Sequence, residues 1–152
     1  MSITVVLGYD GSPAGERALD QAAGEVRRAG GGRVVVVTAY EENVAYPTAA
    51  SIEPPFVPAL AEDELELAEK YALELALKAE ERLKAAGVEC EHVVSDMDPA
   101  DALMTAAADH RAGMVIVGGH RHGALAGIFG GSTTQRLLHH CALPVLVVPP
   151  PD

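Results

Sequence analysis

Short apolar runs alternate along the chain with longer segments in which apolar residues recur at every third or fourth position. The first pattern predicts buried strands, and the second predicts amphipathic helices. Strands are expected at residues 3–9, 33–40, 88–94, 114–118 and 144–148. Helices are expected at about 13–29, 59–86, 98–111 and 132–140. Such an alternation is typical of α/β domains built on a parallel sheet.

Local signals define the first and second helices more closely. Ser12 is a natural N-cap, and Pro13 suits the first helical position. The buried face of the first helix is predicted to hold Ala14, Ala18, Leu19, Ala22 and Val26. The buried face of the second is predicted to hold Leu65, Ala68, Ala72, Leu75, Ala76, Ala79 and Leu83. Its charged pairs, Glu66/Lys70, Glu74/Lys78 and Glu80/Lys84, are predicted to lie on the solvated face.

The composition of the strands predicts their places in the sheet. The unbroken Val run at 34–37 favours burial on both faces and hence a central strand, whereas the alternation at 88–94 favours an edge. Right-handed crossovers then give an open, doubly wound, five-stranded parallel sheet in the order 3-2-1-4-5 with four helices, and one domain over residues 1–152. Ligands of such sheets bind at the carboxyl ends of the strands, where the strand order reverses. The first and fourth strands are expected to flank that point.

Composition narrows the class of protein. The chain has 152 residues, of which 49% are hydrophobic and 4% aromatic, so a core of Val, Leu, Ile and Ala is expected. A net charge of -11 disfavours nucleic acid and anionic membranes as partners. The N-terminus lacks a basic segment before its short apolar run, and no stretch approaches the roughly 20 apolar residues of a membrane span. These features predict a soluble, cytoplasmic protein. Cys90 and Cys141 lack CxxC spacing and are predicted to be reduced thiols.

A glycine-rich segment, GGHRHGALAGIFGGS, joins the fourth strand to the last helix. Glycines leave backbone N–H groups uncovered, and the N-terminus of the following helix carries partial positive charge, so this segment suits a phosphate. The sequence GYDGS at 8–12 follows the first strand and is expected to meet the glycine-rich segment in one crevice. Asp10 in it is a candidate to contact a base or ribose, or to help hold a divalent cation. Equally, a DGS sequence ahead of a helix makes Asp10 a turn former.

The familiar phosphate-binding motifs are absent from the sequence. No Lys precedes Ser132, which excludes GxxxxGK[ST], and GYDGSP after the first strand does not match GxGxxG. His120 and His122 do not match the HxGH site of nucleotidyl transferases in order or place. Without Cys or carboxylate neighbours they also do not predict a metal site. His139 and His140 are expected to end the last helix, where positive charge is favourable. No nucleophile and base pair is recognisable, so a non-enzyme with at most slow hydrolysis of a bound nucleotide is predicted.

The chain resembles the universal stress protein family over nearly its whole length. Gly118, Gly131 and Ser132 fit the spacing G-x2-G-x9-G-[ST], with VIVG before them and STTQRLLHHCALPVLVV after them. The segments VVLGYDGSPAGERALDQA and DPADAL also look like family sequence. The resemblance implies a Rossmann-like fold of the adenine nucleotide α-hydrolase type. It further implies a module that binds ATP, ADP or AMP, with or without Mg²⁺, in stress response or signalling.

The resemblance implies a role for each matched position. Adenine and ribose would meet Asp10 and the backbone near Gly8 and Tyr9, and the backbone of Ala39 would contact the base. Gly118 would lie under the ribose and phosphates, and His120 would lie close to a phosphate. The phosphates would be bound by Gly131, Ser132 and Thr133. For Ser132 a second interpretation stays open, since Ser132 and Gln135 form an S-x-x-Q capping box that stabilises a helix without any ligand.

Arg121 departs from the family motif, because it stands where the motif has its second glycine. Its side chain would either occupy the phosphate space or offer a guanidinium fork to the phosphates. Two functions therefore remain: a nucleotide-binding module, and a stress protein dimer that acts through protein contacts without a nucleotide. A homodimer is predicted, because the last strand, Pro144 to Val148, is apolar and lies at the sheet edge; the resemblance implies pairing of this strand with its copy.

Overall fold

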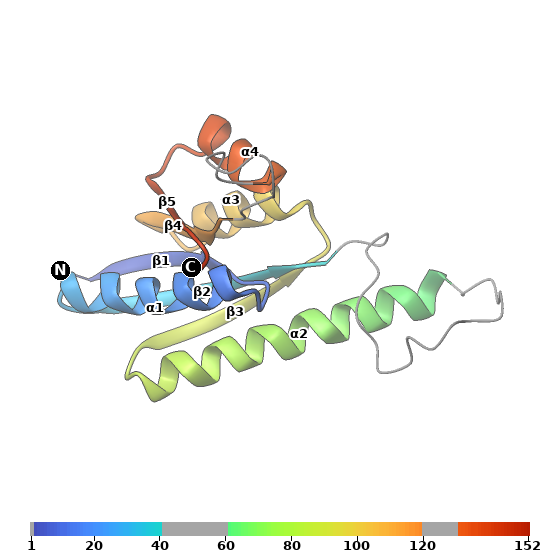
Figure 1. Cartoon of the computed structure of the whole chain (residues 1–152), viewed down its shortest axis with the longest axis horizontal. Coiled ribbons are helices and arrows are strands. Elements are labelled where there is room, and N and C mark those ends of the chain that lie inside the picture. The colour runs from blue at the N-terminus through green and yellow to red at the C-terminus, as the bar shows by residue number, and fades with distance from the viewer. Residues whose placement is uncertain (1, 41–60, 120–130) are drawn as a thin grey trace.

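The computed structural model describes residues 2–40, 61–119 and 131–152. In these residues strands and helices alternate along the chain (Figure 1). The strands are β1 (Ile3–Gly8), β2 (Gly32–Ala39), β3 (Glu89–Ser95), β4 (Met114–Gly118) and β5 (Val145–Val148). The helices are α1 (Pro13–Arg28), α2 (Ala61–Ala85), α3 (Pro99–Asp109) and α4 (Ser132–His140). The predicted elements are confirmed, with ends that differ from the sequence-based bounds by a few residues at most.

The five strands form one parallel sheet in the order β3-β2-β1-β4-β5, which confirms the predicted topology. β1 lies at the centre and pairs with β2 on one side (Leu7 opposite Val36) and with β4 on the other (Leu7 opposite Ile116). The strand order therefore reverses between β1 and β4. The carboxyl ends of these two strands lie side by side at the point where doubly wound sheets bind ligands.

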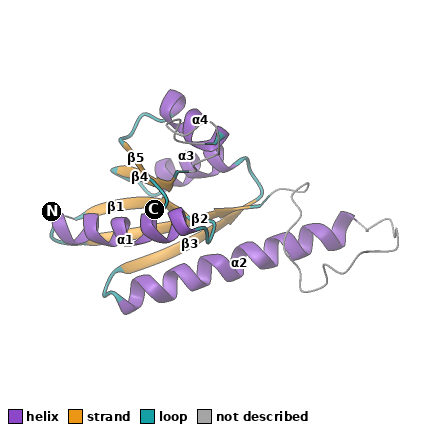
Figure 2. Ribbon diagram, in the orientation of Figure 1, coloured by secondary structure: helices purple, strands orange, loops and turns teal. Residues whose placement is uncertain are grey.

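The helices cover both faces of the sheet, and each face has its own apolar cluster. Helices α1 and α2 pack on one face and α3 and α4 on the other (Figure 2). Side chains of β2 alternate between the faces, Val34 and Val36 toward α1 and α2, Val35 and Val37 toward α3 and α4. All four are at most 3% exposed, so the Val run is buried on both faces as predicted.

The residues predicted to start and to bury the helices do so. The Ser12 hydroxyl caps α1 by accepting from the N–H of Gly15 at 3.0 Å, and Pro13 is the first helical residue. A carboxylate oxygen of Asp98 caps α3 by accepting from the N–H of Ala100 at 3.1 Å. The predicted stripes of α1 and α2 are buried or, at Leu65 and Leu75, packed against the buried clusters. Among the described helices, none is long and apolar enough to cross a membrane.

The prediction that Glu80 lies on the solvated face of α2 is wrong. Glu80 is 8% exposed, and its Oε1 lies 2.6 Å from Nδ1 of His92 on β3. Its Oε2 still pairs with Lys84 at 3.4 Å. The edge strand β3 passes beneath α2 and brings a polar side chain to a position that helical spacing alone assigns to the outside.

Candidate functional site

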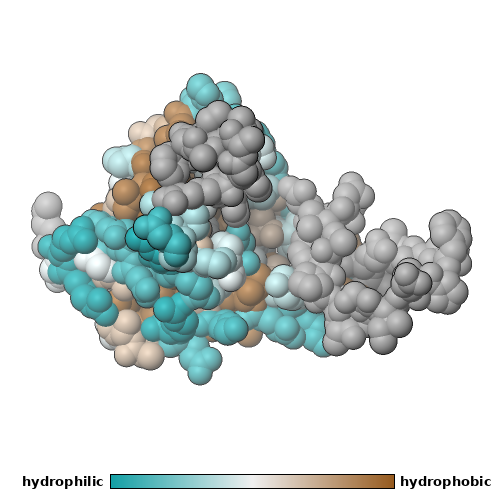
Figure 3. All heavy atoms as spheres, viewed as in Figure 1, coloured by the Kyte–Doolittle hydropathy of each residue, from teal (hydrophilic) through white to brown (hydrophobic). Residues whose placement is uncertain are grey.

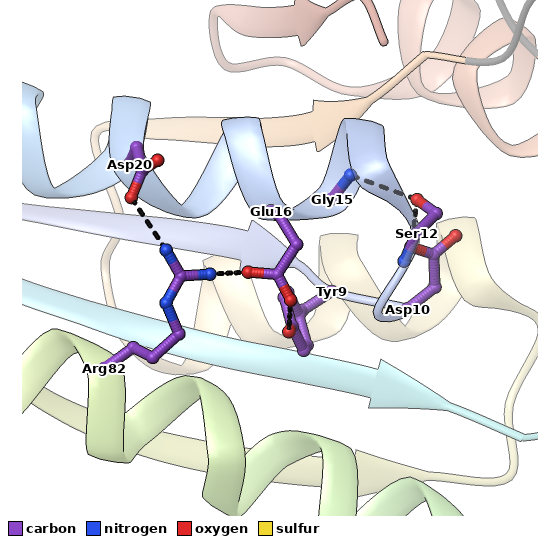
Figure 4. Close-up of polar contacts among 7 residues, drawn as sticks. All are labelled: Tyr9, Asp10, Ser12, Gly15, Glu16, Asp20 and Arg82. Atoms are coloured by element: carbon purple, nitrogen blue, oxygen red, sulfur yellow. Dashed lines mark hydrogen bonds and ion pairs between the residues drawn. The ribbon is translucent and has the colours of Figure 1, made fainter. Parts of the chain in front are cut away.

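The turn between β1 and α1 is held by a chain of short polar contacts. Gly11 adopts a positive φ of 77°, a conformation that favours glycine. Oδ1 of Asp10 accepts from both the N–H (2.9 Å) and the hydroxyl (2.6 Å) of Ser12, which in turn caps α1 (Figure 4). Asp10 therefore does act as a turn former, and this contact also fixes the position of its carboxylate at the end of β1.

The side chain of Tyr9 lies on the α1 and α2 face of the sheet. Its ring is 3% exposed, and its hydroxyl donates to Oε1 of Glu16 (Figure 4). Arg82 of α2 pairs with Glu16 and, at 3.2 Å, with Asp20. Burial raises the pKa of the Tyr9 phenol, and the guanidinium of Arg82 acts in the opposite direction. The phenol thus ties the end of β1 to two helices and leaves only the backbone of Tyr9 for a ligand on the other face.

Gly118 ends β4 directly beneath the start of α1. A Cβ atom at this position would lie 2.8 Å from the carbonyl carbon of Ala14 and 2.8 Å from the amide nitrogen of Gly15. Both contacts are with backbone atoms, which cannot swing aside as a side chain can. The absence of a side chain at 118 is therefore required by the packing of α1 on β4, whether or not a ligand is bound.

The first turn of α4 points its N–H groups toward the same region. Gly131 is the N-cap with an extended backbone, and Ser132 is the first helical residue, so the predicted capping box is wrong. Within the described residues, this helix start has no side-chain cap bond. First-turn N–H groups have no acceptor inside a helix, and the N-terminus carries partial positive charge. With its hydroxyl not used as a cap, Ser132 adds a donor to an anion-binding end.

Arg136 joins α4 to α3 beside this helix start. Its Nη1 lies 2.5 Å from Oδ2 of Asp98, and its Nη2 lies 2.9 Å from Oδ1 of Asp101. Asp98 therefore caps α3 and binds Arg136 with the same oxygen atom. One guanidinium therefore holds the start of α3 to α4, a contact that sequence reasoning missed because no motif links residues so far apart in the chain.

These elements enclose a cavity of about 300 Å³ at the carboxyl ends of the strands. Eight of the ten predicted site residues line it: Gly8, Tyr9, Asp10, Ala39, Gly118, Gly131, Ser132 and Thr133. The other two, His120 and Arg121, lie outside the described residues. The lining also contains residues that the sequence did not single out: Val37, Pro99, Leu103, Val117 and Thr134. The start of α3 at Pro99 was the available signal, since it too follows a strand.

The cavity combines apolar walls with an anion-binding end. Val37, Leu103 and Val117 belong to the apolar cluster on the α3 and α4 face, whereas α4 contributes the N–H groups and hydroxyls of its first turn. Asp10 supplies the one carboxylate among the described lining residues. Ligand sites in proteins are commonly apolar clefts with a few convergent polar groups. The arrangement suits a molecule with a flat apolar part and an anionic part.

Cys90, Cys141, His139 and His140 are not among the residues that line this cavity, and His122 lies outside the described residues. His139 and His140 are the last residues of α4, as predicted. Cys90 and Cys141 are free and half-buried, and burial, helped by the carboxylate of Glu80, raises the pKa of the Cys90 thiol. Across the described parts of the chain, no three His, Cys, Asp or Glu side chains come together as a metal site would require.

Comparisons with known proteins give one consistent family. The model of the universal stress protein family matches residues 1–149. A universal stress protein of Thermus aquaticus is 33% identical over 146 residues, which cover 95% of this chain and 97% of the relative. A universal stress protein crystallised in complex with cAMP is 25% identical, with 97% of both chains covered and a TM-score of 0.67. A family protein of Arabidopsis thaliana with AMP bound is 15% identical, with 99% of this chain and 93% of that chain covered and a TM-score of 0.68.

Proposed function

This chain belongs to the universal stress protein family, and we propose that it binds an adenine nucleotide in the cavity at the carboxyl ends of β1, β2 and β4. The observation that carries the proposal is the meeting of three features in one cavity. These are the apolar walls, the Asp10 carboxylate and the N-terminus of α4. An adenine ring can pack against the apolar walls, a ribose hydroxyl can donate to the Asp10 carboxylate, and phosphates can bind at the N-terminus of α4.

The proposed roles follow the position of each residue in the cavity. Adenine lies against Val37 and Leu103, near the backbone of Ala39 at the end of β2. Asp10, oriented by Ser12, accepts from the ribose hydroxyls. The phosphates face Ser132 and Thr133 in the first turn of α4. The ligand is ATP, ADP or AMP, and Mg²⁺ accompanying it would be held mainly by the phosphates, with Asp10 as the protein carboxylate in reach.

The relative with cAMP supports an adenine nucleotide as the class of ligand, since that protein binds one with the same fold at 25% identity. The AMP-bound protein of Arabidopsis thaliana supports the fold alone at 15% identity. We propose a binding module for stress response or signalling in the cytoplasm, not an enzyme dedicated to hydrolysis. Asp10 is the one carboxylate among the described lining residues, and it already accepts two hydrogen bonds from Ser12. Because this carboxylate is engaged in the turn, we expect any hydrolysis of bound ATP to be slow.

Isothermal titration with ATP, ADP, AMP and adenosine tests this proposal. Ser132→Glu puts a negative charge where the phosphates are proposed to lie, and Gln135→Glu puts the same charge on an exposed residue three positions further along α4. Both changes are compatible with the first turn of a helix. We expect Ser132→Glu to lower the affinity for ATP by at least about tenfold and to leave the affinity for adenosine unchanged. The affinity of Gln135→Glu for ATP should stay within about threefold of the wild-type value. Equal losses in both variants, or none in either, would contradict the phosphate site.

A separate titration tests whether the side chain of Arg121 helps or hinders nucleotide binding. The wild type, Arg121→Gly and Arg121→Ala are titrated with the same nucleotides. Tighter binding by the glycine variant shows that the side chain obstructs the site, and weaker binding by both variants shows that it clamps the phosphates. If none of the three chains binds any nucleotide, the proposal fails and the dimer that works through protein contacts replaces it.

We also propose that the chain forms a homodimer through β5, the edge strand next to β4. The carbonyl of Pro144 accepts from Val115 of β4 and that of Val148 from Gly119 just after β4, so by strand alternation the N–H of Val147 points outward. Hydrophobic residues gather beside α1 toward β5 in Figure 3, and an apolar edge strand invites pairing with a copy.

Val147→Pro removes that outward donor and keeps the bonds to β4. It should halve the mass measured by light scattering, while Val147→Ala, which keeps the N–H, should not. A wild-type chain that is monomeric at micromolar concentration would contradict this dimer.

A further inference from the structure

One side of α2 carries a stripe of exposed residues that the proposed site and the β5 edge do not use. The stripe consists of Glu66, Lys70, Leu73, Leu77, Glu81 and Lys84. At about 100° per residue and 1.5 Å rise, its members fall within an arc of roughly 80° and extend over about 27 Å. The stripe lies roughly opposite the buried face of α2, on the side that faces away from the sheet (Figure 1).

Two leucines lie at the centre of the stripe. Leu73 is 38% exposed and Leu77 is 46% exposed, although leucine on a helix of this fold is normally buried. They are four residues apart and so form one continuous apolar surface on the helix. Charged side chains flank this surface along the helix in both directions.

The charges of the stripe are self-complementary. From its N-terminal end the stripe reads Glu, Lys, Leu, Leu, Glu, Lys. From its C-terminal end it reads Lys, Glu, Leu, Leu, Lys, Glu, so each acidic position matches a basic position when two copies run in opposite directions. In an antiparallel pair with a two-fold axis midway between Leu73 and Leu77, each leucine faces the other leucine of the second copy. Lys70 then faces Glu81 of the second copy, and Glu66 faces Lys84. A parallel pair would instead set like charges against each other.

We propose that α2 packs antiparallel against α2 of a second copy of this chain through this stripe. Lys84 contacts Glu80 within its own helix but is 64% exposed, which leaves its ammonium in reach of a facing carboxylate. The two-fold pairing satisfies the isologous geometry that closed dimers need. Since β3, beneath α2, and β5 are the opposite edges of the sheet, the α2 contact and the β5 pairing can form on the same chain, so that β5 dimers can associate further through α2.

The contact is small, so the association is weak and depends on salt. Two leucines from each chain and exposed ion pairs define an interface below the size of stable complexes. We expect a dissociation constant on the order of 100 µM for this contact, weakening as salt is raised.

Sedimentation equilibrium on the full chain tests the proposal in two backgrounds. In the Val147→Pro chain, where β5 pairing is blocked, the remaining dimerisation should be abolished by Leu73→Gln combined with Leu77→Gln. In the wild type, the same two changes should abolish association beyond the β5 dimer, a readout that does not need the proline variant to fold. The matched control is Leu67→Gln, which replaces a leucine that is 51% exposed on α2 but about 80–120° around the helix from the two leucines of the stripe.

A charge exchange tests the antiparallel register. Lys70→Glu sets two carboxylates against each other at both ends of the contact and should weaken it about tenfold. Lys70→Glu together with Glu81→Lys restores opposite charges and should recover the affinity to within about threefold of wild type. The proposal is overturned if neither background associates through α2 at about 1 mM, if Leu67→Gln weakens association as much as the stripe variants, or if the double exchange fails to restore what the single change removes.

Discussion

Replacing Gly118 with alanine separates a packing role from a ligand role at the same residue. The resemblance to the family implies that Gly118 lies under the ribose and phosphates, which would make the change a defect in binding. The structure adds a reason that is independent of any ligand. The new Cβ would meet backbone atoms of Ala14 and Gly15 at 2.8 Å.

The size of the effect follows from this geometry. Non-bonded carbon atoms prefer about 3.5–4.0 Å, so the start of α1 would have to move away from β4 by at least about 0.7 Å. Overpacking of this kind costs about 1–3 kcal/mol in the free energy of unfolding. For a chain of this size that loss lowers the melting temperature by about 2–12 °C, and it should appear in thermal unfolding followed by circular dichroism without any nucleotide.

Gly24→Ala is the matched control, because it adds the same methyl group to a glycine inside α1. The nearest atom to its new Cβ would be Nη2 of Arg28 at 3.7 Å, an ordinary contact. Alanine in a helix interior should raise the stability by about 0.5–1 kcal/mol. If Gly118→Ala melts at the wild-type temperature and only loses nucleotide, the packing argument is refuted and the glycine serves the ligand.

Three further outcomes are expected from unfolding measurements. Ser12→Ala should lower the free energy of unfolding by about 1 kcal/mol, because the N–H of Gly15 loses its cap. Ser12→Gly should lower it by only a few tenths of a kcal/mol. Tyr9 has a raised pKa in the folded chain, so its contribution to stability is present below about pH 10 and is lost as the pH rises further. The stability of the wild type should therefore fall more steeply than that of Tyr9→Phe when urea unfolding is compared between pH 9 and 11. Arg136→Gln should cost about 0.5–1 kcal/mol at low salt, and the difference from wild type should shrink in 1 M NaCl, because the two ion pairs are partly exposed.

Much of the fold could be predicted from the sequence, because its signals are local. The caps at Ser12 and Asp98 and the spacing of apolar residues lie within a few positions of the features they define. The Val run at 34–37 shows burial on both faces without any knowledge of its neighbours. Glu80 is the exception on α2, because its burial depends on His92, which β3 brings to it from twelve residues further along the chain.

The candidate site was predictable in part for the same reason. Glycine spacing and the resemblance to the family pointed to eight residues that line the cavity. Leu103 was missed because only the packing of α3 on the sheet brings it to the same cavity. The capping box at Ser132 was wrong because the helix begins one residue earlier than that motif requires, with Gly131 as its N-cap.

The sequence by itself determined the elements, their order, the family and the residues at the ends of β1 and β4 that meet at the switch point of the sheet. Periodicity, caps and glycine spacing depend on residues that are close together in the chain, so they can be recognised in the sequence alone. Only the tertiary structure decided that Gly118 must lack a side chain for α1, that Arg136 joins α3 to α4, and that Tyr9 turns its phenol away from the cavity. Those facts depend on how a helix crosses a strand and on which faces come into contact, and no local pattern of residues records that geometry.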